Sequence, residues 1–159
     1  MVVIWEGTRP MLEELQALVD DSHLGSPRRV SLGLDHNRLS MLIAVLHRHG
    51  NIMVGDQDVF VNVVGGVKII DTSADLALIL SIISSFRNKP IPRNIVVFGE
   101  VGLSGEIRPV SSGQERLKEA VKHGFTRAIV PIANAPKKPI PGLKVIGVKK
   151  IFEALQALF

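Results

Sequence analysis

Strand-like and helix-like segments alternate along the 159-residue chain, and this alternation constrains the fold more than any other feature. Short runs rich in Val and Ile are typical of strands, whereas longer runs with apolar residues every three or four positions are typical of helices. The mixed alternation predicts one α/β (α+β) domain over residues 1–159, with a single-layer mixed sheet and helices packed on it. Predicted strands cover residues 2–8, 29–34, 58–64, 95–98, 127–130 and 143–146, and predicted helices cover residues 37–49, 72–86, 112–124 and 149–158.

Three local patterns refine this prediction. Residues 11–19 suit either a helix or one face of a strand. The glycine-punctuated segment 99–110 predicts a hairpin centred on Leu103-Ser104-Gly105. Capping boxes at Thr72-x-x-Asp75 and Ser112-x-x-Glu115 predict where two helices begin, with Asp in place of the usual Glu or Gln in the first box.

The composition excludes several classes of protein. The chain contains no cysteine, so disulfides, zinc knuckles and thiol chemistry are excluded. Its first residues lack the basic and apolar regions of a signal peptide, and no run reaches the ~18–20 apolar residues of a membrane span. We therefore expect a cytoplasmic protein without a membrane partner. The formal net charge of +4 is compatible with nucleic-acid binding but is not specific for it.

Nucleotide and metal motifs are also absent from the sequence. The phosphate-binding pattern G-x-x-x-x-G-K-[ST] does not occur, and the five histidines do not have the spacing of metal ligands. Gly99, Gly102 and Gly105 are not followed directly by a helix, so they are not a dinucleotide fingerprint. The sequence thus predicts no cofactor and no metal for this chain.

Ser73 is the serine best placed for chemistry. It falls in the first turn of the most apolar predicted helix, where exposed backbone N–H groups are able to stabilise an oxyanion. A helix cap formed by Thr72 and Ser73 explains the same pattern without catalysis. The residues alone favour the cap, because no activating partner is evident near Ser73 in the sequence.

Four stretches resemble a known family. They are DVFVNVVGG at residues 58–66, DTSADLA at 71–77, FGEVGLSGEIRPV at 98–110 and KHGF at 122–125. Residues 60–159 resemble the proteolytic domain of Lon proteases, and the whole chain resembles the C-terminal Lon-like domain of the RadA (Sms) family of bacterial DNA-repair proteins. The resemblance implies a Lon-proteolytic-domain-like fold.

Lon proteases pair a serine at the start of one helix with a lysine at the start of a later helix. Ser73-Ala74 matches the serine element, while the lysine position falls on Gln114. An amide is not a general base, and removing the base from such a pair costs several orders of magnitude in rate. The resemblance therefore implies a degenerate dyad at Ser73 and Gln114, no catalytic residue, and a chain that is not an enzyme.

The resemblance to the RadA family also implies a setting for the chain. Those proteins join a zinc element and a RecA-like ATPase core to the Lon-like domain, and are associated with recombination and DNA branch migration. This chain would then be a C-terminal fragment, with ATP, Mg and Zn belonging to the full-length protein, a DNA-dependent ATPase or helicase. Its own roles would be assembly of a homo-oligomeric ring and contact with DNA.

Two alternatives remain open at this stage. One is an active serine–lysine peptidase in which Lys118, one helical turn after Gln114, serves Ser73. The other is a protein–protein docking domain without either activity.

Any DNA contact is expected to be electrostatic and independent of sequence. The chain has no Tyr and a single Trp, so base stacking is excluded as the main mode. Each basic residue taken alone also fits an ordinary solvated surface charge. The candidate phosphate-binding residues are Arg28, Arg29, Arg38, Arg48, Arg87, Lys89, Arg93, Arg116, Lys118, Lys122, Lys137, Lys138, Lys149 and Lys150.

Overall fold

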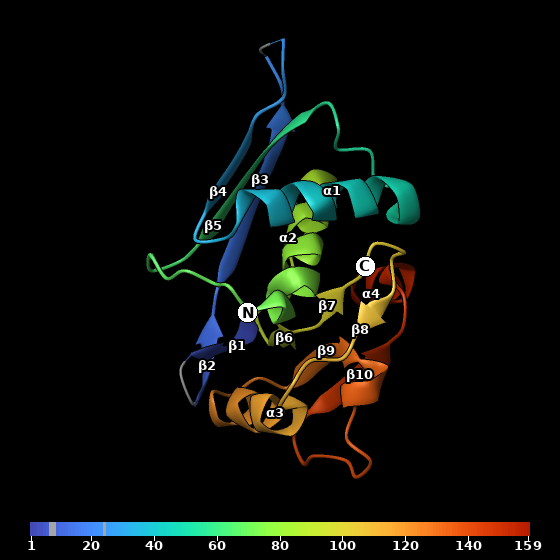
Figure 1. Cartoon of the computed structure of the whole chain (residues 1–159). Helices are drawn as coiled ribbons and strands as arrows, with labels where there is room; N and C mark the ends of the chain where they lie inside the picture. Colours follow the sequence, from blue (N-terminus) through green and yellow to red (C-terminus); the bar gives the residue numbers. More distant parts are fainter. Residues whose placement is uncertain (7–8, 24) are drawn as a thin grey trace.

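Helix α2 (Asp75–Arg87) lies at the centre of the computed structural model, between two three-stranded sheets (Figure 1). Its side chains from Asp75 to Leu80, together with Ile82 and Ile83, are buried. A helix that is apolar on nearly every side needs cover on nearly every side, which the two sheets and the neighbouring helices supply. The structure describes residues 1–6, 9–23 and 25–159, so residues 7 and 8 of the first predicted strand lie outside the described residues.

The first sheet has the order β3-β5-β4. Strand β3 (Leu15–Asp21) pairs antiparallel with β5 (Gln57–Val63), and β4 (Arg29–Leu32) pairs with β5 in parallel. Val59, Val61 and Val63 of β5 are buried on the side that faces the core. The alternation of β5 therefore fixes which face of this mixed sheet covers the helices.

The second sheet is parallel, with the order β10-β9-β6. It is formed by β6 (Ile95–Val97), β9 (Arg127–Pro131) and β10 (Lys144–Val148), and Val96, Ala128, Ile129 and Val130 have no exposed surface. Strands that are buried in this way read as continuous apolar runs, as they do here.

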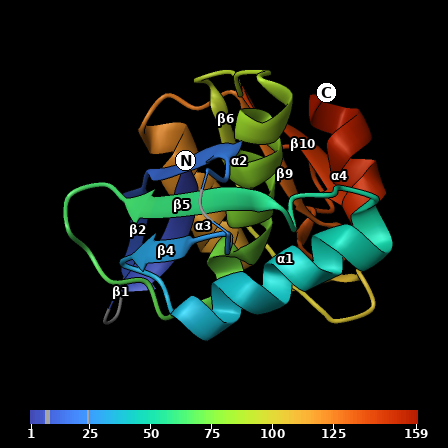
Figure 2. The same ribbon diagram turned by 90° about the horizontal axis from the view of Figure 1, so that it is seen from above.

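The remaining elements close the core around these layers. Helix α1 (His36–Gly50) runs alongside the first sheet, and α4 (Ile151–Leu158) lies beside the carboxyl-terminal end of α1 (Figure 2). The hairpin β1 (Val2–Glu6) and β2 (Arg9–Glu13) packs against α3 (Gly113–Lys122). A second hairpin joins β7 (Glu100–Val101) to β8 (Ile107–Arg108), and two short 3-10 helices cover Thr72–Ala74 and Ile132–Asn134.

The structure confirms some predictions and corrects others. The predicted hairpin at 99–110 is present as β7 and β8, and the ambiguous residues 11–19 fall in two strands, β2 and β3. The prediction of a single-layer sheet is wrong, because one layer would leave half of α2 uncovered. The molecule is a mixed α/β fold with small sheets, and its identity with the Lon fold stays a prediction.

Both predicted capping boxes are wrong in detail. Asp71, not Thr72, caps the helical segment by accepting a hydrogen bond from the Ser73 backbone N–H at 3.0 Å. The Thr72 hydroxyl instead donates to Glu100 at 3.0 Å. Ser112 has a left-handed backbone (φ 59°) and makes no side-chain cap. Short polar side chains form such caps only from extended backbone, which Asp71 has and Ser112 lacks.

None of the helices in the described residues is both long and apolar enough to cross a bilayer.

Gly33 directly follows β4 and packs against the segment that leads to Asp71. Its φ is 91°, and a Cβ there would approach the Val67 carbonyl oxygen at 2.6 Å and the Val63 side chain at 2.7 Å. Gly142 has a similar φ of 80° with nothing within 4 Å of such a Cβ. Gly33→Ala should therefore lower the free energy of unfolding in urea by at least about 1 kcal/mol more than Gly142→Ala, because only the first adds a steric clash to the backbone strain. Equal losses would contradict the close approach.

Candidate functional site

Ser73 belongs to a buried polar cluster, and its partner is an arginine. The Arg116 guanidinium donates from Nη1 to the Ser73 hydroxyl at 2.9 Å and from Nη2 to the Asp71 carboxylate at 3.1 Å. The side chain of Arg116 is 1% exposed, and Ser73 has no exposed surface. The cluster therefore joins α3 to the amino-terminal end of α2 through a charge-assisted contact.

A backbone carbonyl and an aromatic ring also contact the Arg116 guanidinium. Its Nε donates to the Ser111 carbonyl at 2.9 Å, and its guanidinium carbon lies 5.8 Å from the centre of the Phe98 ring. An arginine suits this position because its planar fork serves several acceptors at once and stacks on an aromatic face. The prediction that Arg116 contacts DNA phosphates is thus wrong, because its guanidinium is enclosed by protein.

Asp71 is held in its ionised form by this cluster. Burial alone would raise its pKa, but hydrogen bonds from the Ser73 backbone N–H and hydroxyl and the charge of Arg116 outweigh burial. The pKa of Asp71 consequently lies below its ordinary value.

The two residues expected near Ser73 lie elsewhere. Gln114 and Lys118 are both exposed, and each is two positions from Arg116 in α3. Residues two apart in a helix do not share a face, so the face that meets Ser73 excludes both. Lys118 lines a separate hollow together with Arg9 and Met11. The structure therefore does not bring together the Ser73–Gln114 pair or the Ser73–Lys118 pair.

A buried carboxylate, Asp75, is the first residue of α2. Asp75 accepts hydrogen bonds from the Arg38 side chain, including one at 2.9 Å from Nε, and from the Val101 backbone N–H at 3.0 Å. Burial raises the pKa of Asp75, although Arg38 and Val101 oppose that effect. The ion pair of Arg38 with Asp75 therefore links α1 to α2. A cavity of about 500 Å³ lies beside this pair and is lined by Lys68, Asp71 and several apolar residues.

Two more predicted DNA contacts are engaged with protein atoms. Arg28 pairs with the buried Asp58 at 3.2 Å and lies 5.3 Å from the Phe60 ring centre. Hydrogen bonds from the Arg28 backbone and side chain lower the pKa of Asp58. Arg29 donates to the carbonyls of Val54, Gly55 and Gln57. Both arginines therefore help to pin β4 beside β5.

The other predicted DNA contacts are exposed but do not gather in one place. They come from the carboxyl-terminal parts of α1 and α2, from the segment between α2 and β6, from α3, from the loop before β10 and from the two residues before α4. They are Arg48, Arg87, Lys89, Arg93, Lys118, Lys122, Lys137, Lys138, Lys149 and Lys150.

One group of cations does form a row, at the amino-terminal edge of the parallel sheet. Lys144 and Arg127 are partners in adjacent strands, and Ile95, two residues after Arg93, is the partner of Arg127 on the other side. The Asn94 side chain donates to the Thr126 hydroxyl at 2.8 Å and ties two of these strand starts together. We call Arg93, Arg127 and Lys144 the basic edge.

The sequence around the basic edge is free of acidic residues. Residues 76–99 contain three Lys and Arg, and residues 120–152 contain seven, without a single Asp or Glu in either stretch. Arg127 and Lys144 were not among the predicted contacts, because each looks like an isolated charge in the sequence. The signal that identifies them is their place as the first residue of two parallel strands, which requires knowledge of the register.

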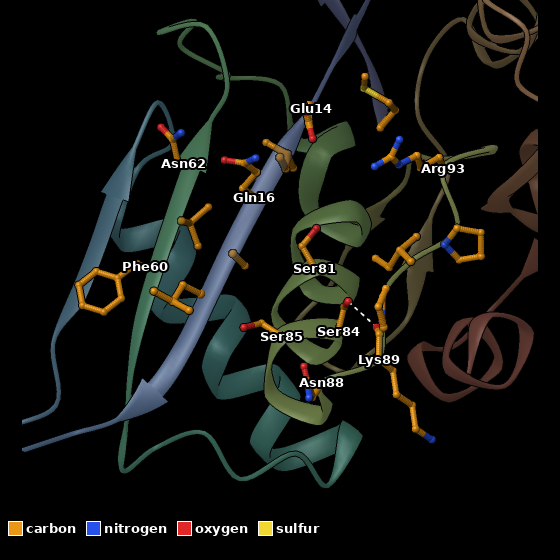
Figure 3. Close-up of a pocket in the computed structure, with 18 of the residues that line it drawn as sticks. Glu14, Gln16, Phe60, Asn62, Ser81, Ser84, Ser85, Asn88, Lys89 and Arg93 are labelled. Atoms are coloured by element: carbon orange, nitrogen blue, oxygen red, sulfur yellow. Dashed lines mark hydrogen bonds between the residues drawn. The ribbon is translucent and has the colours of Figure 1, made fainter.

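A groove opens beside the basic edge (Figure 3). Its volume is about 940 Å³, and it reaches from the outer face of the first sheet (Leu18, Val30, Leu32 and Phe60) across β3 to the segment from Lys89 to Arg93. Ser81, Ser84 and Ser85 of α2 line it. Its volume is within the range of about 300–1,000 Å³ that ligand sites occupy.

Within residues 1–6, 9–23 and 25–159, no group of three or more His, Cys, Asp or Glu side chains is arranged to hold a metal ion.

Removal of the buried guanidinium tests the Ser73 cluster. Arg116→Met should lower the free energy of unfolding by about 2–3 kcal/mol, which is less than the 3–5 kcal/mol of a fully buried pair because Asp71 is partly exposed. Lys118→Met, an exposed change in the same helix, is the control and should cost less than about 0.5 kcal/mol. Urea unfolding at pH 7 gives both values, and equal costs would contradict the cluster.

The acid dependence of the same variant provides a second check. A carboxylate with a lowered pKa adds stability above its ordinary pKa, and this stability is lost as the pH falls through the lower folded value. Arg116→Met raises the pKa of Asp71 in the folded protein, so the variant should lose less stability than the parent between pH 7 and pH 3.

Comparisons with known proteins show what the chain is similar to. Residues 37–134 match the sequence model of the family described as subunit ChlI of Mg-chelatase. The DNA repair protein RadA of Pseudomonas aeruginosa is 66% identical over 159 residues, which is 100% of this chain and 35% of that protein. RadA of Escherichia coli is 64% identical over 155 residues (98% and 34%), and RadA of Bacillus subtilis is 47% identical over 152 residues (95% and 33%). The chain thus spans about a third of the length of these relatives.

These findings contradict the prediction that the chain is not an enzyme. That prediction treated the chain as a degenerate Lon-type tail beside a separate ATPase core, and it depended on Gln114 occupying the position of a lost lysine. The matching family is instead named for a subunit of Mg-chelatase, which is an enzyme. Moreover, Gln114 is exposed, and the Ser73 hydroxyl accepts a hydrogen bond from Arg116.

The extent of the family match decides the classification. It covers residues 37–134, from the start of α1 through α2 and α3 to the end of β9, and so includes more than half of the chain and the whole Ser73 cluster. The chain belongs to the family described as subunit ChlI of Mg-chelatase.

Proposed function

We propose that this chain acts in DNA repair by holding the DNA backbone along the basic edge. The relatives with 64–66% identity are named DNA repair proteins. The observation that carries the proposal is the row of Arg93, Arg127 and Lys144 at adjacent strand starts. Neighbouring strands lie about 4.8 Å apart, so these cations are spaced for successive contacts with one polyanion.

The character of the binding follows from the residues in the row. Lysine and arginine bind phosphate without reading the bases, and the flanking Asn94 and Thr126 already bond to each other. Binding should therefore be independent of sequence and should weaken steeply with salt, because it depends on the release of counterions.

Charge reversal on the basic edge tests this function. The double variant Arg93→Glu with Lys144→Glu should weaken binding of labelled DNA by at least about tenfold and reduce the salt slope by about 1.5–2, through the loss of two phosphate contacts. The matched control is Lys149→Glu with Lys150→Glu, which changes the net charge equally but lies near Glu106 and Glu153. Fluorescence anisotropy over a salt series measures both. Equal losses in the two double variants would show a general charge effect and contradict a defined edge.

The outer face of the first sheet favours a second role in homo-oligomer assembly. Leu18, Phe60 and Val30 are partners in one row across β3, β5 and β4, and Leu18 and Leu32 are 57% and 61% exposed. An apolar row of this kind on an open sheet face marks an interaction surface. It is compatible with the ring that the resemblance to RadA proteins implies.

Assembly through this face has a direct test. Leu18→Lys with Leu32→Lys should shift the sedimentation profile toward the monomer, because both changes place charge on the apolar row. Met41→Lys with Met53→Lys, at exposed apolar positions outside that sheet, should leave the profile unchanged. An unchanged profile in the Leu18 and Leu32 variant would exclude this face.

A further inference from the structure

The groove next to the basic edge has a polar floor, which is unusual for helix α2. Ser81, Ser84, Ser85 and Asn88 follow one another at intervals of three, one and three residues, so they form a stripe on one face of the helix. They lie between β3 and the segment from Lys89 to Arg93 in Figure 3. The first half of α2 is buried, and this half-buried stripe lies on its second half, where Ser81, Ser84 and Ser85 line the groove.

One wall of the groove is the free edge of β3. Strand β3 stands at the end of the order β3-β5-β4, so only one of its sides is paired in the sheet. The Val59 backbone N–H donates to the Arg28 carbonyl, so the backbone N–H and C=O groups of Val59 and Val61 point toward β4. Because the direction alternates along a strand, Phe60 and Asn62 pair with β3, and their partners are Leu18 and Gln16.

The intervening residues of β3 face the groove. Val19 confirms the direction, since its backbone N–H donates to the Ser85 hydroxyl at 2.9 Å. Ala17 shares this orientation, and it is among the residues that line the groove. Its outward N–H and C=O groups are not used in the pairing of β3 with β5. A backbone donor and an acceptor are thus presented side by side to a ligand.

The charges in the groove define the ligand further. Lys89 and Arg93 stand on the wall opposite β3, and Glu14 lies at the same end as Arg93 (Figure 3). Two fixed cations against one carboxylate favour a ligand with negative charge on the side away from β3.

We propose that an extended peptide segment with acidic side chains binds in this groove by adding a strand to the free edge of β3. Its backbone pairs with Ala17, small side chains lie over the serine stripe, and its carboxylates meet Lys89 and Arg93. Strand addition obtains affinity from main-chain hydrogen bonds and specificity from alternate side chains. This role shares Arg93 with the proposed DNA contact on the basic edge, but either proposal stands without the other.

A peptide suits the groove better than a nucleic-acid strand. A single strand would require aromatic faces for its bases, whereas Phe60 and Phe125 at the groove are both half-buried, and Arg28 already covers Phe60. The free N–H and C=O groups of Ala17 complement a peptide backbone, which has the same pair of groups in the same alternation.

The first experiment uses a fluorescein-labelled octapeptide of alternating Thr and Val that ends in two aspartates. Anisotropy against the whole chain should show saturable binding. Two further peptides carry N-methyl groups on alternate backbone amides, one at the odd positions and one at the even positions. The peptide whose methylated amides face β3 should bind at least about tenfold more weakly, because it loses the strand hydrogen bonds. Equal binding of the methylated peptides in both registers would overturn the strand-addition mode.

Two variants locate the peptide. Ala17→Pro removes only the outward N–H of an edge strand, a position at which proline is tolerated. Ser81→Glu adds bulk and negative charge to the floor. Each should weaken peptide binding at least about tenfold, whereas Gln156→Glu, an exposed change of equal charge on α4, should not. Ser81→Glu preserves the test if Ala17→Pro does not fold.

Variants tested with both a peptide and a DNA probe distinguish this proposal from the proposed DNA contact. Lys144→Glu should weaken DNA binding and leave peptide binding intact, which supports two separate sites. If the octapeptide does not bind and a labelled oligothymidylate binds in a manner lost with Ser81→Glu, the groove is a nucleic-acid site and the peptide proposal is overturned. If neither probe responds to Ser81→Glu, the proposal is overturned as well.

Discussion

The rest of the structure depends on the burial of α2. Each Leu or Ile that this helix buries contributes roughly 1.5–3 kcal/mol, and the gain requires apolar cover on opposite sides of the same helix. The mixed sheet β3-β5-β4 covers one side, and the parallel sheet β10-β9-β6 covers the other. The basic edge and the groove both follow from this arrangement, since one is the rim of the second sheet and the other is the strip of α2 that neither sheet covers.

Polar groups enter this core only where they are fully partnered. Asp71, Ser73 and Arg116 satisfy one another between α2 and α3, while Arg38 and the Val101 N–H satisfy Asp75. No described buried side-chain nitrogen or oxygen lacks a partner. Such groups add little net stability compared with apolar residues of the same size, but they admit few alternative packings. The apolar residues thus supply the driving force, and the two clusters at the start of α2 set the positions of α1 and α3 against it.

Sequence patterns located the elements much better than the site. The apolar periodicity of α1 and α2 and the glycines around Leu103 depend on neighbouring residues, and they predicted two helices and a hairpin within a few positions. The burial of Arg116 depends on Asp71, Ser73 and Phe98, which lie far away in the sequence, and a helix pattern assigns any arginine to the surface. The same limit explains why Arg127 and Lys144 were missed and why Gln114 was overvalued. Hydrophobic periodicity predicts which face of a helix a residue lies on, but not which other element packs against that face.

Arg93 connects the two proposed binding surfaces. It stands two residues before β6, where it ends the basic edge, and it also lines the wall of the groove opposite β3. A guanidinium that bonds to a phosphate has fewer donors left for a peptide carboxylate, and the reverse holds as well. Linkage requires the two effects to be equal, so each ligand would reduce the affinity for the other by the same factor. Arg127 and Lys144 lie outside the groove and Ala17 lies outside the edge, so Arg93 is the side chain through which the two sites are coupled.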